Sequence, residues 1–225
     1  MIPKIIHYCW YGKNEMSALS LRCMESWKVF APEHSIKKWD ESNIFFRSPA
    51  FDHAKKHKQW AFMSDIARLY ILFEYGGTYL DVDMEIVKPF EDLSKKSNFI
   101  IGEESELVNC AIVITQPRHP LIKKMIDCLE DHQKKTSEFI PIPNLVDPVV
   151  REWSQTEIFI APKDYFYPYN PYDRERKVKQ LMFSDIKNNT YTIHHYQKSW
   201  SFSFIDLFRS KLRALLKRIL DINYF

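Results

Sequence analysis

Residues 64–83 read SDIARLYILFEYGGTYLDVD, and this stretch decides the fold. Its apolar residues recur at helical spacing and predict a helix over residues 60–75. The expected buried stripe of that helix is Phe62, Ile66, Leu69 and Phe73. Two of the chain's four glycines follow at Gly76 and Gly77. A chain so poor in glycine needs backbone freedom at this point, which predicts a forced end to the helix.

Two carboxylates close the stretch, at Asp81 and Asp83. Residues two apart in an extended segment project to the same side of it. A hard divalent cation that holds a diphosphate would favour this arrangement. A lone D-x-D is weak evidence, because a solvated turn is the better explanation of the motif taken by itself. Here it follows a predicted apolar strand, whose carboxyl end should open into the ligand crevice of an α/β sheet.

The composition predicts one globular domain. A chain of 225 residues with 15% aromatic residues can bury a full core. The net charge of +3 is too mild to indicate a nucleic-acid-binding protein. The four cysteines show no C-x-x-C pairing, which is typical of reduced thiols in the cytoplasm. With no signal peptide and no membrane-spanning apolar run expected, we predict a cytoplasmic protein.

Strands and helices alternate along the chain, which predicts an α/β fold with a mostly parallel sheet, Rossmann-like and flanked by helices. Besides the helix at residues 60–75, helices are expected at 14–30, 120–132 and 205–220. Strands are expected at 4–10, 35–39, 78–87 (bent around the carboxylates), 99–101, 111–115 and 190–195. Residues 140–173, rich in proline and tyrosine, are expected to form a long functional loop.

Three motif blocks occur in order along the chain. They are IPKIIHYCWYG at residues 2–12, Ser64-Asp65-x-x-Arg68 followed by YGGTYLDVD at residues 75–83, and His194-His195 with Ser199-Trp200. Together they resemble the DXD-containing glycosyltransferases of family 32, in the bacterial group of capsular and surface polysaccharide synthesis. The resemblance runs from residue 2 to about residue 200. Asp147-Pro148 stands where that family often has a Gly-Pro element.

The resemblance implies a GT-A catalytic domain over residues 1–204, a nucleotide-sugar donor, usually a UDP-hexose, and retention of the anomeric configuration. It also implies a divalent ion, Mn²⁺ or Mg²⁺, which would stabilise the charge growing on the leaving diphosphate. We expect Asp83 to bind the metal directly and Asp81 to act through water or on the ribose hydroxyls. His194 is expected to complete the metal shell, with His195 as the alternative.

Further donor contacts are predicted from the matched positions. Trp10 is expected to stack on the uracil, although an ordinary core aromatic is the competing reading. His7 is equally well explained as a ligand contact or as a satisfied buried histidine. Asp65 and Arg68 are expected to bind the hexose hydroxyls, with Arg68 also near phosphate, the alternative being a surface ion pair.

The remaining predicted donor residues are Asn109, Ser199 and Trp200. Asn109 lies where the family often places a polar side chain near the sugar, and Ser199 and Trp200 resemble a loop that closes over the diphosphate. Retention by double displacement would need a carboxylate nucleophile, for which Glu103 and Glu104 are the candidates. We favour front-side attack, in which the leaving phosphate takes the acceptor proton.

Residues 205–225 are expected to form a basic amphipathic helix. It either packs on the core or holds the enzyme against anionic lipid, which would suit a glycan or polyprenol-linked acceptor. Three other functions compete with transfer: a nucleotide-sugar-binding protein without turnover, a metal-dependent phosphohydrolase, and a toxin-like transferase that modifies a protein. The phosphohydrolase lacks the extra His and Asp clusters that two-metal sites need.

Overall fold

The computed structural model describes residues 1–12 and 14–197. The elements in chain order are β1 (Ile5–Cys9), α1 (Ala18–Phe30), β2 (Ser35–Trp39), α2 (Pro49–Lys56), α3 (Trp60–Tyr75), β3 (Gly77–Leu80), β4 (Met84–Ile86), η1 (Leu93–Lys95), β5 (Phe99–Glu104), β6 (Leu107–Thr115), α4 (Pro120–Thr136), α5 (Ile142–Arg151), β7 (Phe159–Ala161), α6 (Lys163–Phe166), η2 (Phe183–Asp185) and β8 (Thr192–His194). The predicted alternation of strands and helices is confirmed.

The main sheet has six strands in the order β2-β1-β3-β6-β5-β7. Strand β1 pairs in parallel with β2 and β3, and β5 pairs in parallel with β7, whereas β6 is antiparallel to both of its neighbours. All strands except β6 therefore run the same way, and their carboxyl ends meet at one edge. The chain leaves β3 at this edge directly into Asp81, which is where an open α/β sheet binds ligands.

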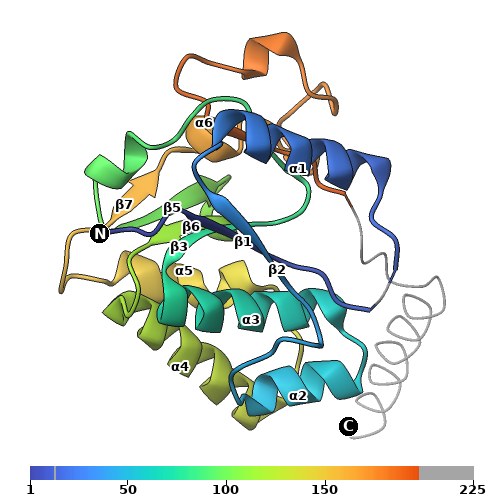
Figure 1. Ribbon diagram of the computed structural model, residues 1–225, viewed down its shortest axis with the longest axis vertical. Coiled ribbons are helices and arrows are strands. Elements are labelled where there is room, and N and C mark those ends of the chain that lie inside the picture. The colour runs from blue at the N-terminus through green and yellow to red at the C-terminus, as the bar shows by residue number, and fades with distance from the viewer. Residues whose placement is uncertain (13, 198–225) are drawn as a thin grey trace, which may run out of the picture.

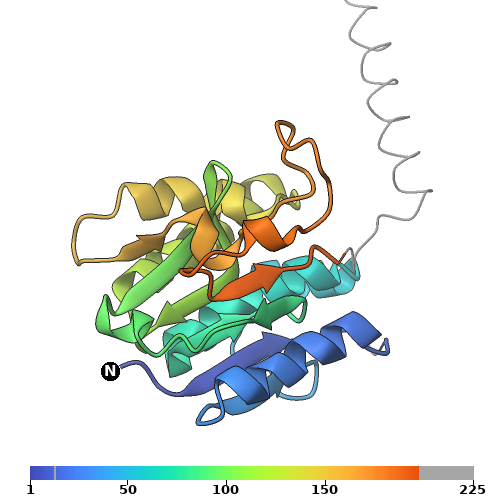
Figure 2. The same cartoon turned by 90° about the horizontal axis from the view of Figure 1, so that it is seen from above.

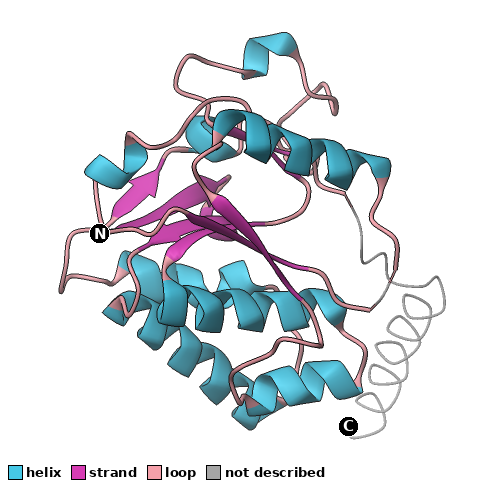
Figure 3. Ribbon diagram, in the orientation of Figure 1, coloured by secondary structure: helices cyan, strands magenta, loops and turns pink. Residues whose placement is uncertain are grey.

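Helices cover both faces of the sheet, as Figures 1 and 3 show. One core lies between the sheet and α2 to α5, with fully buried Met63 and Met125 among its members. The other lies on the opposite face under α1 and α6, where Trp27 and Phe166 are fully buried. Figure 2 looks onto the face of the sheet that α1 and α6 cover. Two cores on one sheet hold the carboxyl edge rigidly in place.

The glycine pair ends α3 as predicted. Both residues have positive φ, 61° at Gly76 and 91° at Gly77. A Cβ on Gly76 would lie 2.5 Å from the backbone nitrogen of Pro117, and one on Gly77 would lie 2.7 Å from the carbonyl oxygen of Ile5. Only glycine fits both the conformation and the space. This turn sends the chain from α3 straight into β3 beside β1.

The burial of α3 is broader than the predicted stripe. Ile66 and Leu69 are buried, but Phe62 and Phe73 are only half-buried. The fully buried positions include Met63 and Leu72, because the helix packs on α2 and α4 as well as on the sheet. A single stripe of helical period describes a helix with one packed face, and α3 has more than one.

The prediction that residues 140–173 form a long loop is wrong. They contain α5, β7 and α6, although Pro148 lies inside α5. The neighbouring Asp147 ties this helix to β6, since its carboxylate accepts hydrogen bonds from the Val108 amide and from Arg151, both at 2.9 Å. Helix α2 was not predicted either, despite Ser48 at its N-cap and Pro49 at its first turn.

A second, two-stranded sheet pairs β4 with β8 in antiparallel register, placing Met84 opposite His194. These strands are more than 100 residues apart in sequence, so this pairing is what brings the C-terminal histidines to the D-x-D turn. Within the described part of the chain, no helix is both long and apolar enough to cross a membrane. All four cysteines are free, in agreement with the expectation of reduced thiols.

Candidate functional site

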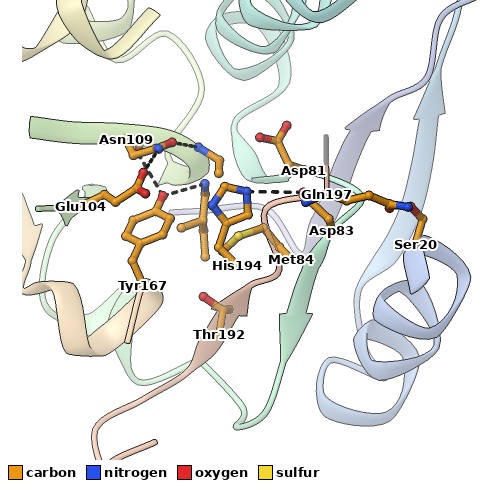
Figure 4. Close-up of polar contacts among 12 residues, drawn as sticks. Ser20, Asp81, Asp83, Met84, Glu104, Asn109, Tyr167, Thr192, His194 and Gln197 are labelled. Carbon is orange, nitrogen blue, oxygen red and sulfur yellow. Dashed lines mark hydrogen bonds and ion pairs between the residues drawn. The ribbon is translucent and has the colours of Figure 1, made fainter. Parts of the chain in front are cut away.

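Three ionisable side chains converge at the carboxyl edge of the sheet: Asp81, Asp83 and His194. One ligand atom from each lies within 4.8 Å of the others. The Nε2 atom of His194 lies 3.5 Å from Oδ1 of Asp83 (Figure 4). Asp81 follows the last residue of β3, Asp83 precedes β4, and His194 ends β8, so the bend between β3 and β4 creates the cluster.

Arg68 fixes the position of the Asp81 side chain. Its guanidinium lies 3.1 Å from Oδ1 of Asp81 and 2.7 Å from Oδ1 of Asp65, and it donates to the Cys110 carbonyl at 2.7 Å. The same group lies 4.5 Å above the ring of Tyr79, whose hydroxyl donates to Asp81 at 3.1 Å. Arg68 is almost fully buried, so these protein contacts define its place. The helix pair at i, i+3 is therefore not a surface ion pair: it positions the first aspartate.

A bulge in β6 turns a backbone carbonyl toward the guanidinium of Arg68. The register of β5 on β6 shifts between Ile101 and Gly102, which are paired with Val113 and Asn109. The Cys110 carbonyl lies in the extra stretch and turns to Arg68. The Ala111 carbonyl accepts the amide of Asp81 at 2.8 Å. The bulge thus ties the start of the D-x-D turn to the middle of the sheet.

The charges of the cluster shift one another. Burial raises the pKa of Asp81, although the Arg68 guanidinium opposes it. Burial also acts to raise the pKa of Asp83, but the hydrogen bonds from His194 and the Gln197 amide outweigh it and lower that pKa. Burial would lower the pKa of His194, and its pairing with Asp83 raises it instead. Burial raises the pKa of Asp65 to about 6. Strong opposing shifts of this kind are typical of functional sites.

Gln197 links the cluster to α1. Its backbone amide donates to Oδ2 of Asp83 at 2.8 Å. Its side-chain carbonyl accepts hydrogen bonds from the hydroxyls of Ser17 and Ser20, at 2.8 and 2.9 Å (Figure 4). Ser17 is also the N-cap of α1. The chain after β8 is thereby fastened across the second aspartate, and nothing in the sequence motifs signals this contact.

The two adjacent histidines point to different partners. His194 joins the aspartates, while Nε2 of His195 lies 2.7 Å from Oε2 of Glu85. Neighbouring residues on a strand alternate between its two faces, which explains the difference. His194 is therefore the histidine that the structure brings to the cluster.

His7 lies in the core and not at the site. It is fully buried, its Nδ1 accepts from the Trp39 indole at 3.1 Å, and its Nε2 lies 3.0 Å from the Gly76 carbonyl. Burial lowers its pKa to about 4, so the ring is neutral. Because both ring nitrogens of His7 have hydrogen-bond partners in the core, neither is available to contact a nucleotide-sugar. The satisfied buried histidine is the correct interpretation, and the predicted donor contact is withdrawn.

The other predicted residues reach the same edge or fall outside the described range. Trp10 directly follows β1 and is half-buried, its indole donating to the Asn14 carbonyl at 2.7 Å. Asn109 lies on β6, where its carbonyl oxygen accepts the Ala111 amide and its amide donates to Glu104 (Figure 4). Ser199 and Trp200 lie beyond the described residues, as does the predicted helix at 205–220.

The two candidate nucleophiles differ in their surroundings. Glu103 pairs with Arg151 at 2.8 Å and is partly exposed. Glu104 turns toward the cluster, bound by the side-chain amides of Asn109 and Asn170. The ring of Tyr196 packs against that of His194, with 4.1 Å between the ring centroids and a tilt of 35° between the ring planes.

The residues present fit a divalent cation. Two carboxylates and one imidazole form a donor set that suits Mn²⁺ and also accommodates Mg²⁺. The Nδ1 atom of His194 is buried without a hydrogen-bond partner among the described residues, an arrangement that protein interiors rarely tolerate. The other ring nitrogen, Nε2, is the one that faces Asp83.

Comparison with known proteins agrees with this geometry. Residues 17–100 match the family model described as the glycosyltransferase sugar-binding region containing DXD motif. This stretch of the chain is therefore similar to the sugar-binding region of DXD glycosyltransferases. This region includes α1, α3 and the D-x-D turn itself, so the matched segment supplies Arg68 and both aspartates of the cluster.

Curated relatives of the DXD region are distant in sequence. Inositol phosphoceramide mannosyltransferase 1 of Schizosaccharomyces pombe is 24% identical over 211 residues, covering 88% of this chain and 62% of that protein. The human alpha-1,4-N-acetylglucosaminyltransferase is 26% identical over 113 residues, covering 50% of this chain and 32% of its own. The chain thus spans less than two thirds of the length of either relative.

Solved structures show the same fold. PaToxG glycosyltransferase superposes with a TM-score of 0.57 at 18% identity, covering 67% of this chain and 68% of its own. The galactosyltransferase LgtC, solved with donor and acceptor sugar analogues, gives 0.52 at 13% identity and covers 94% of each chain. The predicted GT-A fold is confirmed.

Proposed function

We propose that this protein is a metal-dependent glycosyltransferase that moves a hexose from a nucleotide-sugar, with UDP as the preferred nucleotide. The observation that carries the proposal is the Asp81–Asp83–His194 cluster at the carboxyl edge of a GT-A sheet, within a matched DXD region. Asp83 and His194 would hold the ion, and Asp81 would reach it through water or bind the ribose. When bound, the ion supplies positive charge for the leaving diphosphate.

The chain's own residues prepare the site for that charge. Arg68 and Tyr79 fix the Asp81 carboxylate, so its direction is set before a ligand arrives. Gln197 does the same for Asp83. Asp65, which shares Nη2 of Arg68 with Asp81, stays a proposed contact of the donor sugar. Arg68 is proposed to act through Asp65 and Asp81. Asn109 is proposed to face the hexose from β6.

Retention of configuration is part of the proposal, by front-side attack. In this route the leaving phosphate accepts the acceptor proton, and no protein carboxylate bonds to the sugar. Both oxygens of Glu104 already accept amide hydrogen bonds, which supports a positioning role. Glu104→Gln should then retain transfer, and mass spectrometry should find no glycosyl adduct on residue 104. A trapped adduct there would establish double displacement instead.

The acceptor is proposed to be a glycan, including a glycan on a lipid carrier. Two relatives are named for ceramide-linked acceptors: the mannosyltransferase of S. pombe, and lactosylceramide 4-alpha-galactosyltransferase of Pongo pygmaeus, which is 24% identical over 171 residues. Capsular or surface polysaccharide synthesis in bacteria and a cytoplasmic location stay predictions. So does the membrane-associating helix at residues 205–225.

Donor hydrolysis tests the proposal directly. A panel of UDP- and GDP-sugars is incubated with the protein and Mn²⁺, and release of the nucleotide diphosphate is measured. We expect turnover of at least one UDP-sugar, reversible silencing by EDTA, and rescue by added metal. Tight donor binding without any turnover would favour the nucleotide-sugar-binding protein, and hydrolysis of simple phosphate esters would favour the phosphohydrolase.

Trp10 tests the orientation of the donor. Trp10→Ala should raise the donor KM more than it lowers kcat, because stacking on the base acts mainly in the ground state. The loss is on the order of 1–3 kcal/mol. Trp153→Ala is a matched control, since this tryptophan is also half-buried but packs against His119 on another element. Unchanged UDP affinity in a folded Trp10→Ala protein would show that Trp10 is an ordinary core aromatic and does not stack on the base.

A further inference from the structure

One segment of the molecule exposes apolar side chains that no packing explains. Residues 168–187, here called the excursion, run from the end of α6 toward β8 and project from the body of the domain in both views (Figures 1 and 2). Phe183 is 94% exposed, and Val178 and Met182 are 48% and 46% exposed. Scattered single apolar residues are ordinary on a surface, but a phenylalanine that is almost wholly in water on a projecting segment is not.

The excursion is held in shape by one arginine. The guanidinium of Arg176 donates to the carbonyls of Val178 and Gln180, at 2.7 and 2.9 Å, and pairs with the carboxylate of Asp185. It also lies 4.9 Å from the ring centre of Tyr169. These contacts join separate parts of the excursion, so the apolar side chains lie on a preformed loop. Binding would therefore need little further loss of conformational entropy.

The charges around these side chains are nearly all positive. Of the excursion's exposed charged residues, four are cationic and one, Glu175, is acidic. The four cations are Arg174, Lys177, Lys179 and Lys187, of which Lys187 pairs with Asp164 and Lys179 also donates to the Asp173 carbonyl. Its other two acids, Asp173 and Asp185, are half-buried, and Asp185 is engaged by Arg176. Exposed apolar tips among long cationic side chains match an anionic lipid interface, where apolar groups enter the acyl boundary and cations stay at the headgroups.

The base of the excursion touches the candidate site. Asn170 donates to Glu104 at 2.8 Å, and the ring of Tyr169 lies 5.9 Å from that of Tyr196. Tyr196 in turn packs against His194. Contact of the excursion with a surface would therefore fix the position of the cluster relative to that surface.

We propose that the excursion is a membrane-contacting loop, with Phe183 and Met182 entering an anionic lipid surface and Lys177 and Lys179 binding its headgroups. It is distinct from the predicted helix at residues 205–225. That it delivers a lipid-linked acceptor to the site rests on the proposed function. That it binds lipid does not, since the contact needs neither metal nor donor.

Sedimentation of the full chain with vesicles tests the contact, in the absence of donor. The vesicles are phosphatidylcholine alone or with phosphatidylserine. We expect binding to the anionic vesicles that fades as salt rises. Phe183→Ser should weaken it roughly fivefold to tenfold, and Lys177→Ala with Lys179→Ala roughly tenfold. Val29→Ser is the matched control, because Val29 is 68% exposed on α1, and it should bind like the unmodified protein.

A site-specific probe separates the excursion from any other lipid contact. Phe183→Cys is labelled with an environment-sensitive fluorophore, the native thiols being buried or half-buried. Its emission should shift to the blue on anionic vesicles, and the same label at Val29→Cys should not shift. No vesicle binding, equal binding by Phe183→Ser, or an unshifted label would each overturn the proposal. So would an acidic protein that competes the shift away. Donor hydrolysis by Phe183→Ser should stay unchanged, so failure of lipid binding is distinguishable from failure of the proposed function.

Discussion

Two polar clusters lie beside neighbouring strands of the same sheet and differ in how their charges are satisfied. Around His7 on β1, each ring nitrogen has one partner, and burial keeps the imidazole neutral. Around Asp83 after β3, ligand atoms of three ionisable groups lie within 4.8 Å of one another, and Nδ1 of His194 has no hydrogen-bond partner among the residues that the structure describes. The first cluster is complete without a ligand and belongs to the fold. The second is not complete, and this difference is what marks it as the site.

The largest expected effect is on the incomplete cluster. Asp83→Asn removes a metal-binding charge and should lower donor turnover by more than about 100-fold, because even partners of a metal ligand contribute 10–100-fold. Because the pKa of Asp83 is lowered in the folded protein, its charge contributes stability at neutral pH, so Asp83→Asn should also unfold at a somewhat lower temperature, and turnover is compared on protein shown to be folded. His195→Asn, one residue from the cluster but paired with Glu85, is the control and should keep its turnover. Near-normal turnover of Asp83→Asn would remove the distinction between the clusters.

The complete cluster should respond in stability and not in chemistry. His7→Phe leaves the Trp39 indole and the Gly76 carbonyl without partners in the core, at about 1–3 kcal/mol for each buried unsatisfied group. We expect a loss of about 2–3 kcal/mol in the free energy of unfolding near pH 7.5, measured by urea denaturation. Donor KM should be unchanged in the folded fraction. A donor KM that rose with intact stability would return His7 to the site.

That loss should depend on pH in a defined direction. His7 has its pKa lowered to about 4 by burial, while in the unfolded chain it titrates near 6.5. Between these values the unfolded state binds the extra proton, so the native protein loses stability as pH falls from about 6.5 toward 4. His7→Phe lacks this term, so its deficit relative to the unmodified protein should shrink over that window. A deficit that stayed constant with pH would show that His7 is not buried neutral.

A smaller effect is expected at Gln197, which binds Asp83 and is itself held by α1. Its side chain is satisfied by two serines of α1, and its amide serves Asp83. Gln197→Ala should weaken Mn²⁺ binding about tenfold, as expected for a group that orients a metal ligand. Ser20→Ala removes one of the two anchors and should have a smaller effect of the same kind. Unaltered Mn²⁺ affinity in Gln197→Ala would show that the hydrogen bonds of the Gln197 side chain serve only the fold.

The sequence was most informative where local rules act alone. The bounds of α3 and its end at Gly76 follow from apolar spacing and glycine, and the structure agrees with them. It failed for α5, where two prolines hide a helix that depends on packing and on the contact of Asp147 with the backbone of β6. Tertiary context overrode propensity there. His7 could not be assigned, because a buried and a ligand-binding histidine look alike until both nitrogens are seen.

The cluster itself was only partly predictable. The spacing of Asp81 and Asp83 suggested a metal site, and the family resemblance added His194. The support from Tyr79, Cys110 and Gln197 was not foreseen, because it arises from a strand bulge and from a chain return of more than 100 residues. Such second contacts carry no local sequence signal.

Titration with Mn²⁺ alone, followed by the loss of free-ion electron paramagnetic resonance signal, tests the central claim most directly. The account predicts one Mn²⁺ bound per chain, affinity that rises when UDP is added, and loss of binding in both Asp83→Asn and His194→Ala. His195→Ala and His7→Phe should bind like the unmodified protein. Binding that survives in Asp83→Asn and His194→Ala would contradict the account, because the ion would then be held elsewhere.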